Sequence, residues 1–444
     1  MTSTTTELTG EVVRAGDPGY EEARLGYNRL YQRSPQAIVF CRNTADVVNA
    51  VRYAREAGIA FRARSGRHNL EGWSAVDGGL IIDVSRMKDI DVDESAGTAT
   101  VGTGLVQKEA VAALGERGYA IPTGSEGGVG LGGVVLGGGF GLLTRRMGLA
   151  CDKLVAAEIV VAEGADSAKA IHIDEANHPD LLWACRGGGG NNFGITTAYT
   201  VKLEKLADVA FLYAAWTGLD DLPAILRTWQ RDAPFADDRL TSAISITESG
   251  PALSAIWYGG TREDLTSALK PLLEIGSPEV TISEEPWPAI YDDVDKAENA
   301  DNSKFFSQFI KSPFPDDAID LICKFMASAP GPAGNYFLSS FGGAVRNEPP
   351  GGSAFPHRDA LFYCEPGAEW NGSDLTPAAL EWVADFARAM RPYVDGAYVN
   401  VPNVSASDWE RQYYGSHVDR LRQVKATYDP FNVFNFEQSV PPKT

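Results

Sequence analysis

Glycine is concentrated in two short stretches, and this pattern constrains the fold more than any other feature of the sequence. Residues 124–141 read GSEGGVGLGGVVLGGGFG, and residues 187–194 read GGGGNNFG. Glycine permits unusual backbone angles and close approach to a ligand, at a cost in conformational entropy. Val129, Leu131 and Val134 interleave with these glycines, whereas flexible linkers are polar. The pattern therefore predicts ordered loops whose backbone lies against a ligand.

The order of apolar segments predicts two lobes. Residues 37–41, a helical stripe that ends at Gly58 and residues 59–63 form a strand–helix–strand opening, which is typical of an α/β lobe. Beyond residue 206 glycines become fewer, and strands alternate with helices in an α+β pattern. The sequence therefore divides near residue 206 into a glycine-rich α/β lobe and an α+β lobe.

Charge and cysteine usage exclude several classes of function. The net charge of -20 makes nucleic acid and anionic membranes poor partners, because like charges repel. No apolar run reaches the roughly 18 residues of a membrane-spanning helix, and the N-terminus lacks the apolar region of a secretory signal. The five cysteines are scattered without a C-x-x-C pair, and no histidine pair suggests a metal site. We expect a cytoplasmic protein with reduced thiols and no bound metal.

The turn RSGRHN at residues 64–69 follows the second strand of the opening. Backbone N–H groups in such a turn form a nest for anions, and Arg64, Arg67 and Ser65 suit a diphosphate. The turn is neither a Walker loop nor the glycine fingerprint of a Rossmann fold. By itself it leaves His68 open to a structural or a reactive role.

Four motifs in order resemble a known family. They are RSGRHNLEGWSAVDGG, GGVGLGGVVLGGGFGLLTRRMGLACDKL, GGGGNNFGITT and YDPFNVFNFEQSV. Together they resemble the vanillyl-alcohol-oxidase (PCMH) type of FAD-binding fold, and within it the berberine-bridge-enzyme-like branch, over about 35–205 and 355–440. The resemblance implies an α+β protein with a two-lobed FAD-binding domain over 1–205 and a substrate-binding domain over 206–405, whose antiparallel sheet is covered by helices. It also implies a C-terminal segment over 406–444 that returns to the FAD-binding domain.

The resemblance also implies how the flavin is attached. The family histidine that bonds to the flavin 8-methyl group matches His68. A cysteine that makes a second link in many relatives matches Glu126, so a single link is expected, as in hydroxynicotine oxidase. Val129 matches a position where a small side chain favours reaction with oxygen. The implied flavin contacts are Arg64, Ser65, Gly66, Arg67, His68, Asn69, Ser74, Gly128, Val129, Gly130, Gly132, Gly133, Gly137, Gly138, Gly139, Gly141, Leu149, Asp152, Asn192, Gly194, Ile195, Asn432 and Asn435, with Gln438 in the same tail motif.

For the catalytic base, the resemblance points to the strand DALFYCEPG and to tyrosines near the C-terminus. Glu365 matches a position where some relatives carry a catalytic carboxylate, and Tyr363 shares its face of the strand because side chains alternate. Further candidates are Tyr398, Asn400 and Tyr414, whereas His357 is interpreted as structural. Each tyrosine is equally compatible with a buried core position.

The expected function is oxidation of a small-molecule alcohol, a sugar or a natural product, with hydride transfer to FAD and then to dioxygen. Amine oxidation or oxidative cyclisation on the same scaffold is the alternative. Residues 336–341 lack the charged pair of amine-oxidising relatives, which disfavours a nicotine-like amine. A flavin-binding protein without turnover is a third hypothesis.

Overall fold

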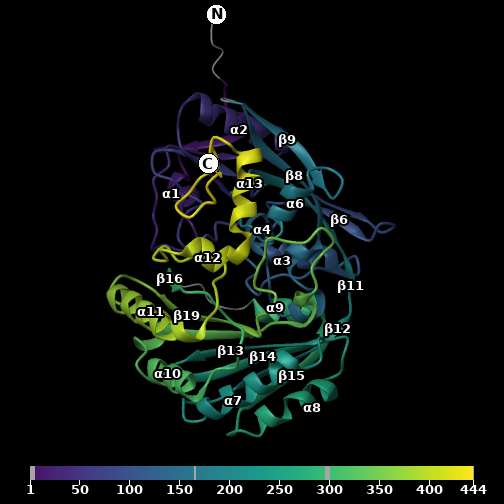
Figure 1. Ribbon diagram of the computed structural model, residues 1–444, viewed down its shortest axis with the longest axis vertical. Helices are drawn as coiled ribbons and strands as arrows, with labels where there is room; N and C mark the ends of the chain where they lie inside the picture. Colours follow the sequence, from purple (N-terminus) through teal and green to yellow (C-terminus); the bar gives the residue numbers. More distant parts are fainter. Residues whose placement is uncertain (1–5, 165–166, 296–300, 444) are drawn as a thin grey trace, which may run out of the picture.

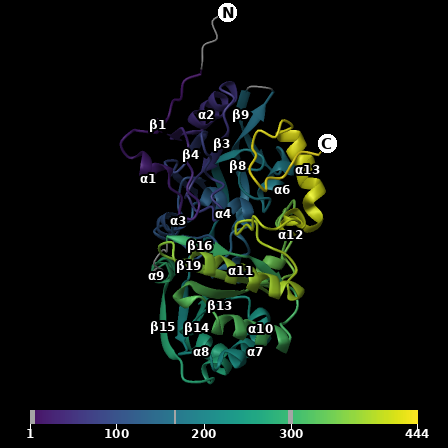
Figure 2. The same cartoon turned by 90° about the vertical axis from the view of Figure 1, so that its left-hand side faces the viewer.

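The computed structural model describes residues 6–164, 167–295 and 301–443. Two lobes are stacked along the long axis of the molecule (Figure 1). The first lobe holds the N-terminal half and the C-terminal tail, and the second holds the middle of the chain (Figures 1 and 2). Within the described residues, no helix is both long and apolar enough to cross a membrane.

A mainly parallel sheet opens the first lobe. Its strand order is β1-β2-β4-β3, with β2, β4 and β3 parallel and β1 antiparallel to β2. The helix α2 connects β2 to β3, as the apolar stripe predicts, and buries Val47 and Val51 against the sheet. These elements are β1 (Glu11–Arg14), α1 (Tyr20–Arg24), β2 (Ala37–Phe40), α2 (Thr44–Glu56), β3 (Phe61–Arg64) and β4 (Leu80–Asp83).

An antiparallel five-stranded sheet completes the first lobe, in the order β5-β6-β10-β8-β9. Its strands are β5 (Ile90–Asp93), β6 (Thr98–Gly102), β8 (Leu154–Glu163), β9 (Ser167–Asp174) and β10 (Ile195–Lys202). Between β6 and β8 lie α3 (Gln107–Gly115), β7 (Tyr119–Ala120), α4 (Leu131–Gly137) and α5 (Thr144–Met147), and after β9 comes α6 (Pro179–Cys185). The expected glycine-rich loop thus contains a helix, α4. Val135 and Leu136 in its apolar run are buried in the core and support it.

The second lobe is built on one antiparallel sheet in the order β15-β12-β14-β13-β18-β19-β16, and β17 also pairs with β19. The strands are β12 (Asp208–Ala215), β13 (Leu240–Thr247), β14 (Gly250–Tyr258), β15 (Glu279–Pro286), β16 (Asn302–Phe305), β17 (Gln308–Ile310), β18 (Gly334–Ser340) and β19 (Phe362–Trp370), while β11 (Glu204–Lys205) pairs with β7. One face packs against α7 (Leu222–Asp232), α8 (Arg262–Leu273), α10 (Asp316–Ala327) and α11 (Thr376–Met390). The other face packs against the first lobe and α9 (Trp287–Val294).

The tail returns to the first lobe through α12 (Trp409–Tyr414) and α13 (Val418–Tyr428), shown in yellow in Figure 1. Lys425 of α13 is completely buried, and its ammonium donates to the carbonyls of Asn192 and Phe434 and to Asp429. The Val440 N–H donates to Asn192 Oδ1 (2.8 Å). The tail is therefore fixed to the second glycine-rich stretch.

The α+β class and the helix-covered antiparallel sheet predicted from the sequence are confirmed.

Candidate functional site

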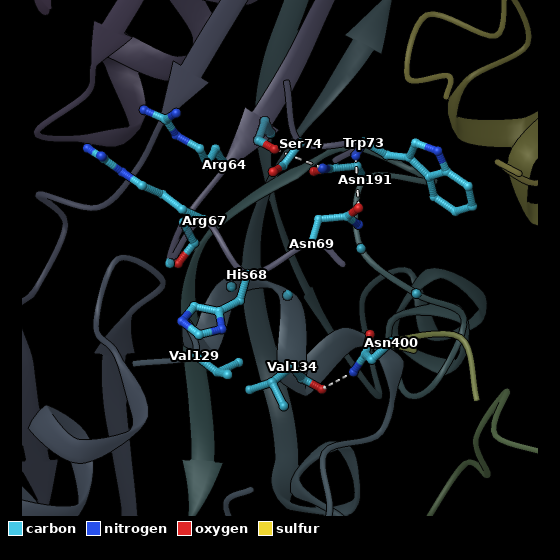
Figure 3. A pocket seen from close by; sticks show the side chains of 18 of the residues that line it. Arg64, Arg67, His68, Asn69, Trp73, Ser74, Val129, Val134, Asn191 and Asn400 are labelled. Carbon is cyan, nitrogen blue, oxygen red and sulfur yellow. Dashed lines mark hydrogen bonds between the residues drawn. The ribbon is translucent and has the colours of Figure 1, made fainter. Parts of the chain in front are cut away.

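A groove in the first lobe lies between the 64–69 turn, the start of α4, the second glycine-rich stretch and the tail (Figure 3). It encloses about 1100 Å³, including the part that opens to solvent. Its lining residues are Ala63, Arg64, Ser65, Gly66, Arg67, His68, Asn69, Trp73, Ser74, Val84, Val129, Gly130, Gly132, Gly133, Val134, Gly189, Gly190, Asn191, Ile195, Thr196, Val399, Asn400, Tyr413, Phe436 and Gln438. A space of this size accommodates a large organic cofactor.

The 64–69 turn presents backbone donors to this groove. Among the described residues, no hydrogen bond is made by the N–H groups of Gly66, Arg67, His68 and Asn69. Consecutive free N–H groups form a nest that binds an anion such as a diphosphate. The turn requires glycine at position 66, because a Cβ there would lie 2.3 Å from the backbone nitrogen of Gly130.

The polar side chains of this turn have other partners. The Arg64 guanidinium is buried and pairs with Asp83 at 2.7 Å, and the Arg67 guanidinium donates to the Glu22 carbonyl at 3.2 Å. The Ser65 hydroxyl donates to the Thr103 carbonyl at 2.6 Å. Arg64 and Arg67 nevertheless line the groove, and Arg64 Nη1 has no hydrogen-bond partner among the described residues, so their contribution to diphosphate binding stays a prediction.

Two neighbouring glycines on the groove wall leave its backbone uncovered. A Cβ on Gly133 would meet no protein atom within 4 Å, and one on Gly190 would come no nearer than 3.8 Å to the Gly133 Cα. Larger side chains at either position would project into open space rather than into the core. These positions therefore let a ligand such as a flavin nucleotide approach the backbone closely.

His68 lies at one end of this groove, beside Val129 and below Asn69 in Figure 3. Its ring stacks on Tyr27 with centroids 4.2 Å apart, and its Nδ1 lies 3.7 Å from Glu126 Oε2. Burial lowers the pKa of His68 to about 4, although the charge of Asp295 opposes this shift. The imidazole is consequently neutral at pH 7, the state in which a ring nitrogen is a nucleophile.

Carboxylates gather where His68 meets the second lobe. Glu126 keeps 61% of its side chain exposed, yet the surrounding protein and the charges of Glu369 and Asp295 raise its pKa to about 7. Burial raises the pKa of Glu365 to about 8; the hydrogen bond from Tyr363 opposes this, and the charges of Glu126 and Glu369 add to it. Raised pKa values at a ligand site mark candidates for proton transfer.

The sequence correctly predicted that Tyr363 and Glu365 share one face of their strand. The Tyr363 hydroxyl donates to Glu365 Oε2. The Tyr363 ring also contacts Phe140 of the first lobe, with centroids 4.8 Å apart. Because burial and Glu365 raise the pKa of Tyr363, the hydroxyl keeps its proton at neutral pH. This pair is thus a buried acid–base pair at the junction of the two lobes.

The other predicted catalytic residues have different surroundings. The Tyr398 hydroxyl accepts hydrogen bonds from the Gly139 N–H (2.8 Å) and from Asn400 Nδ2 (2.9 Å). The Tyr414 hydroxyl donates to the Gly188 carbonyl at 3.1 Å. Both tyrosines therefore hold glycine-rich backbone, and only Asn400 lines the groove, where it donates to the Val134 carbonyl (Figure 3). His357 stacks on Phe309 in the core, consistent with a structural role.

Several predicted flavin contacts lie outside the groove lining. They comprise Gly128, Gly137, Gly138, Gly139, Gly141, Leu149, Asp152, Asn192, Gly194, Asn432 and Asn435. Gly138 and Gly139 accept hydrogen bonds from the 150–151 segment, and Asp152 pairs with Arg358 at 2.5 Å. Gly128 is next to the groove, because a Cβ there would lie 3.0 Å from His68 Nε2.

In the tail, one of the three amides expected near the flavin, Gln438, lines the groove. Asn435 is exposed and donates to the Asn432 carbonyl, and Asn432 has a positive φ of 51°, typical of a turn asparagine. Phe436 lies on the groove together with Gln438. Trp73, Val134, Asn191 and Tyr413 also line it and were not predicted. Three of these had a signal, since Trp73, Val134 and Asn191 fall inside the quoted motifs.

Comparisons with known proteins agree with this geometry. The FAD binding domain family matches residues 35–165, and the berberine and berberine-like family matches residues 397–441. An FAD-linked oxidoreductase of Bacillus subtilis, YgaK, is 39% identical over 442 residues, 98% of either chain. The solved structure of BBE-like 1 from Physcomitrella patens has a TM-score of 0.91 at 27% identity, over 98% of each chain. That of Phl p 4, a grass pollen allergen with glucose dehydrogenase activity, has a TM-score of 0.87 at 26% identity, over 97% of each chain.

The geometry of the groove and of the acid–base pair at the lobe junction is consistent with the class of protein to which these relatives belong. Backbone donors and the uncovered glycine backbone fit a flavin nucleotide, and the relatives with this fold are FAD-linked oxidoreductases. The chain belongs to the berberine-bridge-enzyme-like family of FAD-linked oxidoreductases.

Proposed function

We propose that the protein is an oxidase of a small-molecule alcohol, either a sugar or a natural product, that carries FAD on a single covalent link to His68. When bound, the flavin takes a hydride from the substrate and passes the electrons to dioxygen, which gives hydrogen peroxide. The protein must hold the flavin, orient the alcohol and remove the hydroxyl proton. Oxidation of glucose by the related pollen protein supports a sugar or another alcohol as substrate.

A neutral, partly buried imidazole supports the covalent link. Because the pKa of His68 is lowered to about 4, a ring lone pair is free at physiological pH. Tyr27 fixes the ring by stacking, and Gly128 leaves room beside Nε2. The position expected for a second linking cysteine holds Glu126, and a carboxylate cannot form the corresponding thioether.

The hydrogen bond between Tyr363 and Glu365 is the observation that carries the proposed chemistry. Glu365 is the base: its raised pKa of about 8 gives its carboxylate a higher proton affinity than an ordinary glutamate has. Tyr363 orients the carboxylate through this hydrogen bond, and the carboxylate takes the proton of the substrate hydroxyl. Glu126 connects this pair to His68, since it approaches the imidazole and its charge acts on Glu365.

The test combines flavin attachment with turnover. Acid precipitation of the wild-type protein should leave yellow flavin in the pellet, and His68→Ala should release it to the supernatant. Sugars and alcohols are then screened for anaerobic bleaching of the flavin and for peroxide formation in air. Glu365→Gln should abolish bleaching, whereas Glu369→Gln, four residues along the same face of β19, should retain it. Flavin only in the wild-type supernatant would disprove the covalent link, and equal bleaching by Glu365→Gln would disprove the assigned base.

One observation favours amine oxidation as a second candidate function. Glu126, Asp295, Glu365 and Glu369 influence one another electrostatically, and within the described residues Lys108 is an ion-pair partner of this group, 3.9 Å from Asp295. A substrate amine would neutralise part of this charge. Preferential bleaching by amino alcohols over their neutral counterparts would support this candidate.

A further inference from the structure

A buried ion pair joins the segment that directly follows the 64–69 turn to the second lobe. Glu71 follows His68 by three residues and is 2% exposed, and Lys304 of β16 is 7% exposed. The Lys304 ammonium donates to Glu71 Oε1. This contact spans 233 residues of sequence, so it fixes one lobe relative to the other at the side of the groove where His68 lies.

Two further groups satisfy the Glu71 carboxylate. The Tyr31 hydroxyl donates to Oε2, and the Val404 N–H donates to Oε1 at 3.2 Å. Lys304 Nζ also lies 3.3 Å from the Tyr31 hydroxyl oxygen. An ion pair this deeply buried adds little net stability compared with an apolar pair of the same volume, because both charges lose hydration. Its directed hydrogen bonds instead impose one geometry on four separate segments.

A second polar connection lies beside the first. The Asn28 amide donates to the carbonyls of Leu70 and Ser303, each at 2.8 Å, and its oxygen accepts from the Ser303 N–H at 3.1 Å. Asn28 therefore connects the segment after the 64–69 turn to β16 through hydrogen bonds to the main chain of both. Its neighbour Tyr27 is the residue that stacks on His68.

These contacts connect the two halves of the proposed active site. Asn69 Oδ1 accepts from the Glu71 and Trp73 N–H groups, which makes the turn that carries His68 rigid. On the other side, Ser303 of β16 pairs with Glu369 of β19, the strand that carries Glu365. The position of His68 relative to Glu365 is thus set through Glu71, Lys304 and Asn28.

We propose that Glu71 and Lys304 are positioning residues, whose buried ion pair holds His68 in the place required for flavin attachment and sets the flavin relative to β19. The inference rests on the proposed role of His68. Attachment forms one bond between an imidazole nitrogen and the flavin 8-methyl carbon, and one N–H and one C–H hydrogen are lost. The two electrons pass through the flavin to dioxygen, which leaves with the two protons as hydrogen peroxide.

The test separates positioning from stability. Glu71→Gln and Lys304→Met each leave a buried partner uncompensated and should lower Tm. The double variant Glu71→Met/Lys304→Met removes both charges, so its Tm should return towards that of the wild type. Its fraction of acid-stable flavin should nevertheless fall about tenfold or more, because a displacement of about 1 Å costs a reaction up to about 100-fold. Its visible flavin spectrum should also differ from that of the wild type.

Arg145→Met is the matched control. Arg145 is another buried cation between the lobes, where it donates to the carbonyls of Leu240, Pro234 and Phe341, and it lies outside the groove. This variant should lose Tm and keep its attached flavin and spectrum.

Wild-type attachment and spectrum in the double variant would overturn the proposal, as would an equal loss of attached flavin in Arg145→Met. If the wild-type protein itself holds FAD without a covalent link, the attachment assignment fails separately. The positioning role is then decided by the visible spectrum and the FAD Kd of the same variants.

Discussion

The pH dependence of turnover should report the ionisation of Glu365. With a pKa of about 8, roughly a tenth of this carboxyl is ionised at pH 7 and roughly nine-tenths at pH 9. If the ionised form accepts the substrate proton, kcat/KM should rise about tenfold over this interval, and its profile gives the pKa of the free enzyme.

Two variants should move this profile in opposite directions. Glu126→Gln removes a negative charge that raises the pKa of Glu365, so the midpoint should shift to lower pH. Tyr363→Phe removes the hydrogen bond that lowers it, so the midpoint should shift to higher pH. The assay is the initial rate of peroxide formation, or the rate of anaerobic bleaching, from pH 6 to pH 10. A midpoint that is the same in both variants and in the wild type would refute the assignment of Glu365 as the base.

The same ionisation should affect stability. Because the pKa of Glu365 is raised in the folded protein above its ordinary value of 4.5, the folded state binds the proton more tightly, and stability decreases as pH rises from about 4.5 to 8. Glu365→Gln has no carboxyl group at this position, so it does not lose stability in this way as the pH rises. Its free energy of unfolding at pH 9 should exceed that of the wild type by about 1–3 kcal/mol, measured by urea unfolding. This range is smaller than the full pKa shift implies, because Glu365 is partly exposed and solvent screens its charge. A variant that is less stable than the wild type at pH 9 would contradict the raised pKa.

Three further predictions follow from local structure. Arg67 has a φ of 65°, which is costly for a residue with a side chain, so Arg67→Gly should stabilise the protein by about 0.5–1 kcal/mol in urea unfolding, and destabilisation would contradict this. Gly133→Leu should place its side chain in the groove, so FAD content should fall while far-UV circular dichroism stays unchanged; full FAD content would show that the groove binds something else. Lys425→Met should lower stability by about 3–5 kcal/mol, because it leaves the buried Asp429 carboxylate unpaired, and a loss below about 1 kcal/mol would refute this.

The parts of the site that depend on local sequence were predictable. The 64–69 turn carries its backbone donors and His68 within six residues, so its placement on the groove follows from its order between two strands. Alternation along β19 placed Tyr363 and Glu365 on one face. In both cases the relevant geometry is set by neighbours in the chain.

The remaining parts depend on contacts between distant segments. Nothing in the sequence indicates that Tyr398 and Tyr414 turn their hydroxyls to glycine-rich backbone rather than to the groove. The tail contains three similar amides, and only packing decides that Gln438 lies on the groove while Asn435 faces solvent. The pair of Glu71 and Lys304 was missed for the same reason, since a glutamate and a lysine so far apart look like ordinary surface residues.

The return of the tail to the first lobe has a consequence for how the protein matures. The groove is lined by residues from Ala63 to Gln438, and the buried ammonium of Lys425 fixes the tail to the second glycine-rich stretch. A ribosome that has made the whole first sheet, and even the whole second lobe, has therefore not yet made a closed cofactor site. The complete groove exists only after Gln438 has left the ribosomal exit tunnel, so the full set of flavin contacts forms after both lobes have been synthesised.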